Sequence, residues 1–193
     1  MADRRVGIGH NQGPGMDAGH RWRTYQWRKA QKEMMPNTIP LMVVRMRVRR
    51  AAELGMDYKT YATARQAAGR DILGLLFSSN ALRIIGGDAA MPQDRAQALA
   101  AVRNAGRLAL VHRPHHPDRV QAANPVLDAA ALAPDITTSW SDMRDRVAGF
   151  VRDRGLIGDQ VVVIGDTVLE AEWAPAMRAA SYLSADRYFP AQS

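Results

Sequence analysis

The sequence predicts a mixed α/β protein: a helical N-terminal segment followed by a small, largely parallel sheet of three or four strands, with flanking helices and a C-terminal hairpin. Two observations carry this prediction. Short apolar runs at residues 82–85, 108–111 and 161–164 each end in a turn, which is typical of buried strands. Amphipathic stretches separate the runs, and the order β-α-β-α-β favours parallel pairing. Because so small a sheet covers its edge strands poorly, we expect the chain to form a homodimer.

Composition divides the 193 residues into a tail (1–20), a basic helical segment (21–80) and a small α/β domain (81–193). Five glycines and few apolar residues predict a disordered tail. The absence of cysteine excludes disulfides, thiolate metal sites and a cysteine nucleophile. No apolar run reaches the roughly 18 residues of a membrane-spanning helix, and the N-terminus lacks the apolar core of a secretory signal. We therefore expect a cytoplasmic protein without a membrane partner.

The basic segment is predicted to contain three helices. The first begins after Pro40 and ends at Gly55, which suits the left-handed position at a helix C-terminus. Asp57 then caps a second helix, which Gly69 ends. Residues 70–82 are apolar on most sides and are predicted to form a third, central helix. Helix termination explains the small polar residues near its end, Ser78, Ser79 and Asn80.

Two further helices are predicted between the strands. One covers residues 92–106 and ends at Gly106. The other covers residues 141–155, with Ser141 as its cap and Gly155 at its end. Its apolar residues recur at the spacing of one helix face: Met143, Val147, Phe150 and Val151.

The segment after residue 164 has two interpretations. Thr167 and Glu170 match a capping box, which would begin a helix there. Alternatively, Gly165 and Asp166 form a hairpin turn and residues 167–173 return as a strand. We favour the hairpin, because Pro175 then lies in the first turn of a last helix, where proline is tolerated.

The stretch VVVIGDTVLEA also resembles the strand-turn-strand of the amidinotransferases that modify guanidino groups. Those enzymes use a cysteine nucleophile, and this chain has no cysteine. The resemblance therefore implies only the hairpin geometry.

The positive charge is concentrated at the N-terminus. Residues 1–50 carry a net charge of +8 and the rest of the chain −1, so the first quarter of the chain accounts for the whole net charge of +7. This asymmetry indicates a polyanionic partner, and aromatic residues among the arginines suit stacking on nucleic-acid bases. The leading hypothesis is a cytoplasmic nucleic-acid-binding protein with a regulatory role. A docking helix for an acidic protein partner is one alternative, and a helix that packs its aromatics on the protein is another.

The helix pair around Gly55 has the spacing of a helix-turn-helix, although a plain helical hairpin gives the same pattern. Its second helix would read DNA through Lys59, Thr60, Thr63 and Arg65. The complete set of predicted nucleic-acid-binding residues is Arg21, Trp22, Arg23, Tyr25, Trp27, Arg28, Lys29, Lys32, Arg45, Arg47, Arg49, Arg50, Lys59, Thr60, Thr63 and Arg65.

A rival hypothesis makes the chain an α/β enzyme or a small-molecule-binding domain. Histidines and aspartates follow the predicted strands, and ligands bind at the carboxyl ends of parallel strands. A proline-stiffened surface turn explains the histidines equally well. The sequence specifies no reaction, metal or cofactor. The candidate site residues are Asp88, His112, Arg113, His115, His116 and Asp166.

Overall fold

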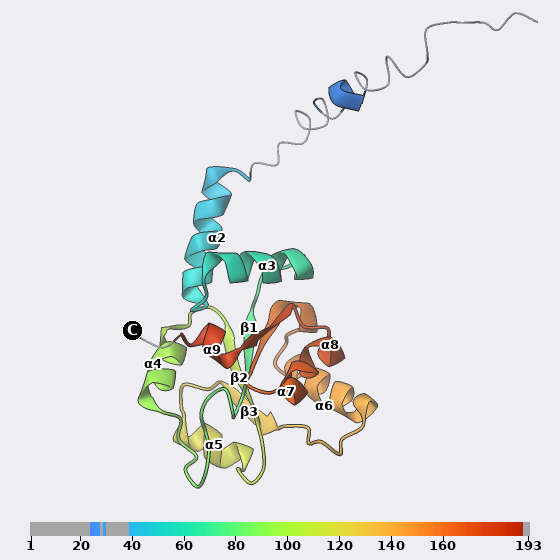
Figure 1. The fold of residues 1–193 in the computed structure, drawn as a ribbon. Helices are drawn as coiled ribbons and strands as arrows, with labels where there is room; N and C mark the ends of the chain where they lie inside the picture. The colour runs from blue at the N-terminus through green and yellow to red at the C-terminus, as the bar shows by residue number, and fades with distance from the viewer. Residues whose placement is uncertain (1–23, 28, 30–38, 191–193) are drawn as a thin grey trace, which may run out of the picture. The chain divides into compact units, whose positions relative to one another are not determined.

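The structure is a computed structural model that describes residues 24–27, 29 and 39–190 (Figure 1). The chain divides into two compact units, Met1–Val44 and Arg45–Ser193. The predicted tail lies outside the described residues. So do five of the predicted nucleic-acid-binding residues: Arg21, Trp22, Arg23, Arg28 and Lys32.

The second unit is built on a parallel sheet, which confirms the mixed α/β class. In the described residues this sheet has five strands in the order β3-β2-β1-β4-β5, and every neighbouring pair is parallel. The sequence predicts only three or four. The strands are β1 (Gly74–Ser78), β2 (Gly106–Val111), β3 (Ala129–Leu132), β4 (Val161–Gly165) and β5 (Ser181–Ser184).

Helices flank both faces of the sheet (Figure 1). Leu75 and Phe77 of β1 belong to one core cluster, with residues of α3, α4, α5 and α9. Leu76 points to the other cluster, with residues of α6 and α8. The helices are α2 (Leu41–Glu53), α3 (Tyr58–Ala68), α4 (Gln93–Ala101), α5 (Pro117–Ala123), α6 (Trp140–Arg152), α7 (Val168–Ala171), α8 (Trp173–Met177) and α9 (Ala185–Tyr188), with a short 3-10 helix at Gly158–Gln160. Within this described part of the chain, no helix has the length and apolar character needed to cross a bilayer.

The signals at the helix ends are largely confirmed. Gly55 follows α2 with φ of +68°, and Gly69 ends α3 with φ of +70°. The Asp57 side chain caps α3 by accepting a hydrogen bond from the Thr60 backbone N–H at 2.9 Å. Ser139, two residues before the predicted cap, performs the same function for α6. All four predicted apolar residues of α6 are buried: Met143, Val147, Phe150 and Val151.

The predicted third helix is wrong, because residues 74–78 form the central strand β1. This strand has neighbours on both edges and helices on both faces, so all five of its residues are buried. Full burial removes the alternation that distinguishes a strand from a buried helix. Gly74 reflects the crowding, since an added Cβ would lie 2.7 Å from Leu156 Cδ1.

Two other predicted segments also differ. Residues 82–85 form a turn rather than a strand, and Leu82 and Ile84 are buried because this turn covers the core. The predicted helix 92–106 ends early, as α4 stops at Ala101 and Gly106 begins β2.

The predicted C-terminal hairpin is wrong, and the capping-box interpretation is correct. Thr167 caps α7 and Glu170 completes the box. β5 then lies parallel to β4, which a hairpin cannot produce. Pro175 is the third residue of α8, in the first turn, where its missing N–H is harmless.

Candidate functional site

The strand order creates a topological switch point at the carboxyl ends of β1 and β4. The connection after β1 leads through α4 to β2, whereas the connection after β4 leads through α7 and α8 to β5. The two connections diverge at the sheet edge, and in open parallel sheets ligands bind at such a switch point.

A buried network of side chains lies at this switch point. Glu170 is fully buried, and its Oε1 accepts a hydrogen bond from Asn80 Nδ2 at 2.8 Å. Its Oε2 accepts from the backbone N–H groups of Asp166 and Thr167. His112, just beyond β2, places its Nε2 3.6 Å from Oε1. Burying a carboxylate costs free energy unless hydrogen-bond donors surround it. The contacts of Glu170 come from the ends of β1, β2 and β4, so its side chain ties these three strand ends together.

His112 is held neutral in this network. Burial lowers the pKa of its imidazole, while the negative charge of Glu170 opposes the shift. The ring stacks on Trp173 with centroids 5.6 Å apart, and Nδ1 lies 3.0 Å from Ser79 Oγ. Ser79 Oγ accepts the His112 backbone N–H at 3.1 Å, so its own proton is available for Nδ1. Ser79 is 1% exposed and cannot be reached as a nucleophile, so the contacts of this network hold the strand ends together.

The three predicted histidines divide between two places. His112 belongs to the buried network, whereas His115 and His116 line a separate cavity of about 410 Å³ beside Gly86 and Gly87. His116 Nδ1 lies 3.5 Å from Asp118 Oδ2.

The other predicted residues of this site are exposed. Asp88 accepts the Ala90 backbone N–H at 3.0 Å, which is ordinary turn chemistry. Arg113 and Asp166 are also exposed. Among the residues that the structure describes, no group of three or more His, Asp or Glu side chains is placed to hold a metal ion.

A second cavity at the same edge is lined by several charged side chains. We call it the arginine pocket; its volume is about 680 Å³. Arg83 lies in the turn after β1, Arg95 in the first turn of α4, and the remaining wall comes from α9 and the residues after it. The lining side chains that matter below are Arg83, Asp94, Arg95, Asp186, Tyr188 and Phe189.

Arg95 is the unusual residue of this pocket. Its side chain is only 10% exposed, and its Nε has no hydrogen-bond partner. The nearest carboxylate oxygen, Asp94 Oδ2, is 3.7 Å away, which is an ion-pair contact but too long for a hydrogen bond. The guanidinium lies 4.0 Å from the centroid of the Phe189 ring, and burial lowers its pKa. The pocket thus contains a buried cation with an unused donor.

Sequence reasoning missed this pocket, although one signal was available. Arg95, Leu99 and Val102 recur at the spacing of one helix face, and all three are buried. An arginine on the apolar face of a helix needs an explanation, and the pocket supplies it. Arg83 and Asp186 carry no such local signal, since only the fold brings them together.

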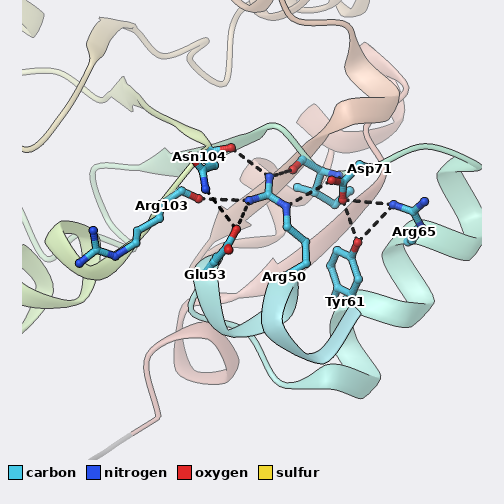
Figure 2. A network of polar contacts seen from close by, with 8 residues as sticks. Arg50, Glu53, Tyr61, Arg65, Asp71, Arg103 and Asn104 are labelled. Carbon is cyan, nitrogen blue, oxygen red and sulfur yellow. Dashed lines mark hydrogen bonds and ion pairs between the residues drawn. The ribbon is translucent and has the colours of Figure 1, made fainter. Parts of the chain in front are cut away.

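The predicted nucleic-acid-binding residues of the second unit differ in whether their side chains are already paired within the protein or remain available to contact a phosphate. Arg50 uses all five of its N–H groups within the protein (Figure 2). Its acceptors lie in the last turn of α2 and at the amino ends of β1 and β2: Glu53, Asp71 and the carbonyl oxygens of Ile72, Arg103 and Asn104.

Side chains of α3, the helix predicted to read DNA, also make contacts within the protein. Arg65 pairs with Asp71 at 3.2 Å, as Figure 2 shows. Thr60 is buried and accepts a hydrogen bond from Arg187 at 2.9 Å. Thr63 Oγ donates to the Lys59 carbonyl oxygen at 2.9 Å. Of this helix's predicted set, only the Lys59 side chain has no hydrogen bond or ion pair within the described residues.

Comparison with protein-family models, with curated proteins and with solved structures found no match to this chain. The function must therefore be inferred from the geometry of the site.

Proposed function

We propose that this chain binds a small anionic molecule in the arginine pocket. The observation that carries the proposal is the unpartnered Nε of Arg95, a side chain that is nine-tenths buried. Removing a charged donor from water costs free energy unless a partner replaces the water. A ligand oxyanion at this position would supply the missing partner, and a guanidinium binds such groups through two parallel hydrogen bonds.

The position and size of the pocket support this function. It opens at the carboxyl edge of a parallel sheet, where such folds bind their ligands. Its volume of about 680 Å³ lies within the range of small-molecule sites. Aromatic side chains form part of its wall, and charged groups converge on it.

Inorganic phosphate is the simplest probe of this function. We expect phosphate to raise the melting temperature of the protein by an amount that grows with the logarithm of its concentration above Kd, because binding to the native state stabilises it by RT ln(1 + [L]/Kd). Arg95→Met should abolish the effect, and Arg146→Met, a matched change on the exposed surface of α6, should preserve it. Equal responses of all three proteins to phosphate would overturn the proposal.

Nucleic-acid binding is a second candidate function, and one observation favours it. Arg45 and Arg49 lie four residues apart in α2, so they share one helix face. Both are exposed, and neither side chain has a hydrogen bond or ion pair within the described residues. Two cations on one face can contact successive phosphates, although Arg50 beside them is fully engaged.

Salt dependence tests this candidate. Each phosphate contact on duplex DNA contributes about 0.9 to the slope of log K against log salt. The double variant Arg45→Gln, Arg49→Gln should therefore lower the slope by about 1.8, whereas Arg146→Gln, Arg152→Gln on α6 should leave it unchanged. Similar slopes for the two double variants would exclude α2 as the DNA-contacting helix.

Sedimentation of the same samples measures their oligomeric state and so tests the expected homodimer.

A further inference from the structure

The arginine pocket contains more than an anion site, and its other groups define the ligand further. We propose that it binds a phosphorylated, hydroxyl-bearing molecule of nucleotide size, with a nucleoside monophosphate as the best-fitting class. This inference rests on the proposed function, since it names the ligand of the same pocket.

The cations of the pocket come from two separate elements. Arg95 belongs to α4, and Arg83 to the turn between β1 and α4. Arg83 adopts a left-handed backbone conformation with φ of +56°, which costs free energy for a side chain that carries a Cβ. The following turn does include glycines, at positions 86 and 87, yet the strained position is an arginine. Backbone strain of this kind clusters at ligand sites, and Arg83 is one of the residues that line the pocket.

Two carboxylates line the same pocket and limit which anions it accepts. Asp94 and Asp186 are both well exposed, at 69% and 85%. Asp186 Oδ1 lies 4.0 Å from Arg83, too far for a hydrogen bond, so its acceptor capacity remains available. With two arginines and two aspartates the lining is formally neutral. A polyanion would be repelled by the carboxylates, whereas a ligand that also carries hydroxyl donors would bind to them.

The aromatic wall suits a flat or apolar portion of the ligand. Phe189 and Tyr188 pack edge to face with centroids 4.7 Å apart, and Phe77 of β1 supports both rings. The Tyr188 hydroxyl donates to the Leu54 carbonyl oxygen at 2.9 Å. Only the ring of Tyr188 is therefore available to the pocket. Both rings are less than a tenth exposed and the Arg95 guanidinium covers one face of Phe189, so the wall offers ring edges to an apolar portion of the ligand.

The three features together select the ligand class. Arginines bind a phosphate, aspartates accept sugar hydroxyls, and aromatic rings contact a base. Inorganic phosphate would occupy only a small part of a cavity of about 680 Å³.

Four probes separate the contributions of phosphate, sugar and base to the affinity in a calorimetric titration: inorganic phosphate, ribose 5-phosphate, adenosine and adenosine 5′-monophosphate. We expect ribose 5-phosphate to bind about tenfold more tightly than phosphate, and the monophosphate about tenfold more tightly again. Adenosine, which lacks the anion, should bind most weakly. Arg95→Met should remove binding of all three phosphorylated probes, and Arg146→Met should have no effect.

Asp186→Asn provides the sharper variant, because Asp186 is exposed and its substitution leaves the fold intact. We expect it to weaken ribose 5-phosphate and the monophosphate about tenfold while leaving inorganic phosphate unchanged or slightly tighter. If phosphate binds through Arg95 but the sugar phosphates bind no more tightly, this inference is wrong and the proposed function stands. If no probe binds, both are wrong. An unchanged affinity of the Asp186→Asn protein for ribose 5-phosphate, relative to the wild type, would exclude hydroxyl recognition by that carboxylate.

Discussion

A largely buried arginine lies at each end of the parallel strands, one at the amino ends (the amino edge) and one at the carboxyl ends (the carboxyl edge). The two arginines differ in whether the protein satisfies their hydrogen-bond donors. Arg50 lies at the amino edge, where five acceptors satisfy its five N–H groups (Figure 2). Arg95 lies at the carboxyl edge, where Nε has no acceptor and the nearest carboxylate oxygen is 3.7 Å away. Their side chains are almost equally covered, at 13% and 10% exposed.

The difference shows that burial alone does not reveal what an arginine does. A guanidinium with a full set of acceptors has its geometry fixed and has no remaining donor for a ligand. One without them carries a desolvation cost that a ligand can relieve. We therefore propose that the amino edge serves stability and the carboxyl edge binding, which agrees with the general placement of sites in parallel α/β sheets.

The largest effect is expected at the amino edge. Arg50→Met should lower the free energy of unfolding by about 3 kcal/mol, because it removes the Arg50 donor from Asp71 Oδ2 and from three backbone carbonyl oxygens. Urea denaturation provides the measurement. Arg49→Met, the same change at the exposed neighbouring position, should cost less than about 0.5 kcal/mol. Equal destabilisation by the two substitutions would contradict the structural role of Arg50.

A smaller, pH-dependent effect is expected at the carboxyl edge, where His112 is held neutral. Its pKa in the folded state is lowered by burial, so the unfolded chain takes up the proton first as the pH falls below about 6.5. The stabilisation is complete above that pH and is lost as the pH falls toward the folded pKa. The slope that one such group adds is at most about 1.4 kcal/mol per pH unit.

Unfolding of His112→Gln between pH 7 and pH 5 should therefore show a shallower loss of stability than unfolding of the wild type. His116→Gln, which alters an exposed histidine of the same turn, should retain the wild-type slope. A wild-type slope in both variants would show that His112 is not the titrating group.

The smallest effect on stability is expected for Arg95→Met. Replacing a buried, poorly paired cation by an apolar side chain of similar length is often neutral or stabilising. Urea denaturation without ligand should place this variant within about 0.5 kcal/mol of the wild type or above it. A loss as large as that of Arg50→Met would indicate that Arg95 supports the fold, and would remove the contrast between the two edges.

Much of the fold follows from local sequence signals. The ends of α3 and α6 and the apolar face of α6 could be predicted, because caps and helical periodicity depend on residues within one or two turns. β2 and β4 could be predicted as short apolar runs that end in turns. Sequence reasoning placed a site at the carboxyl edge, but none of its candidate residues lines the arginine pocket. Arg83, Arg95 and Asp186 come from separate segments that only the folded sheet brings to one cavity.

The sequence by itself determined the α/β class, the parallel pairing, and the helices whose signals lie in neighbouring residues. The tertiary structure decided between strand and helix for residues 74–78, since burial on both faces removes the periodicity that the choice requires. It also decided the conformation after β4, because Glu170 reaches its full set of donors only when Asn80, 90 residues earlier, lies beside it. The roles of Arg50 and Arg95 were decided in the same way. Arg50 finds its acceptors on segments some fifty residues away, whereas Arg95 lies at the wall of a cavity where its Nε has none.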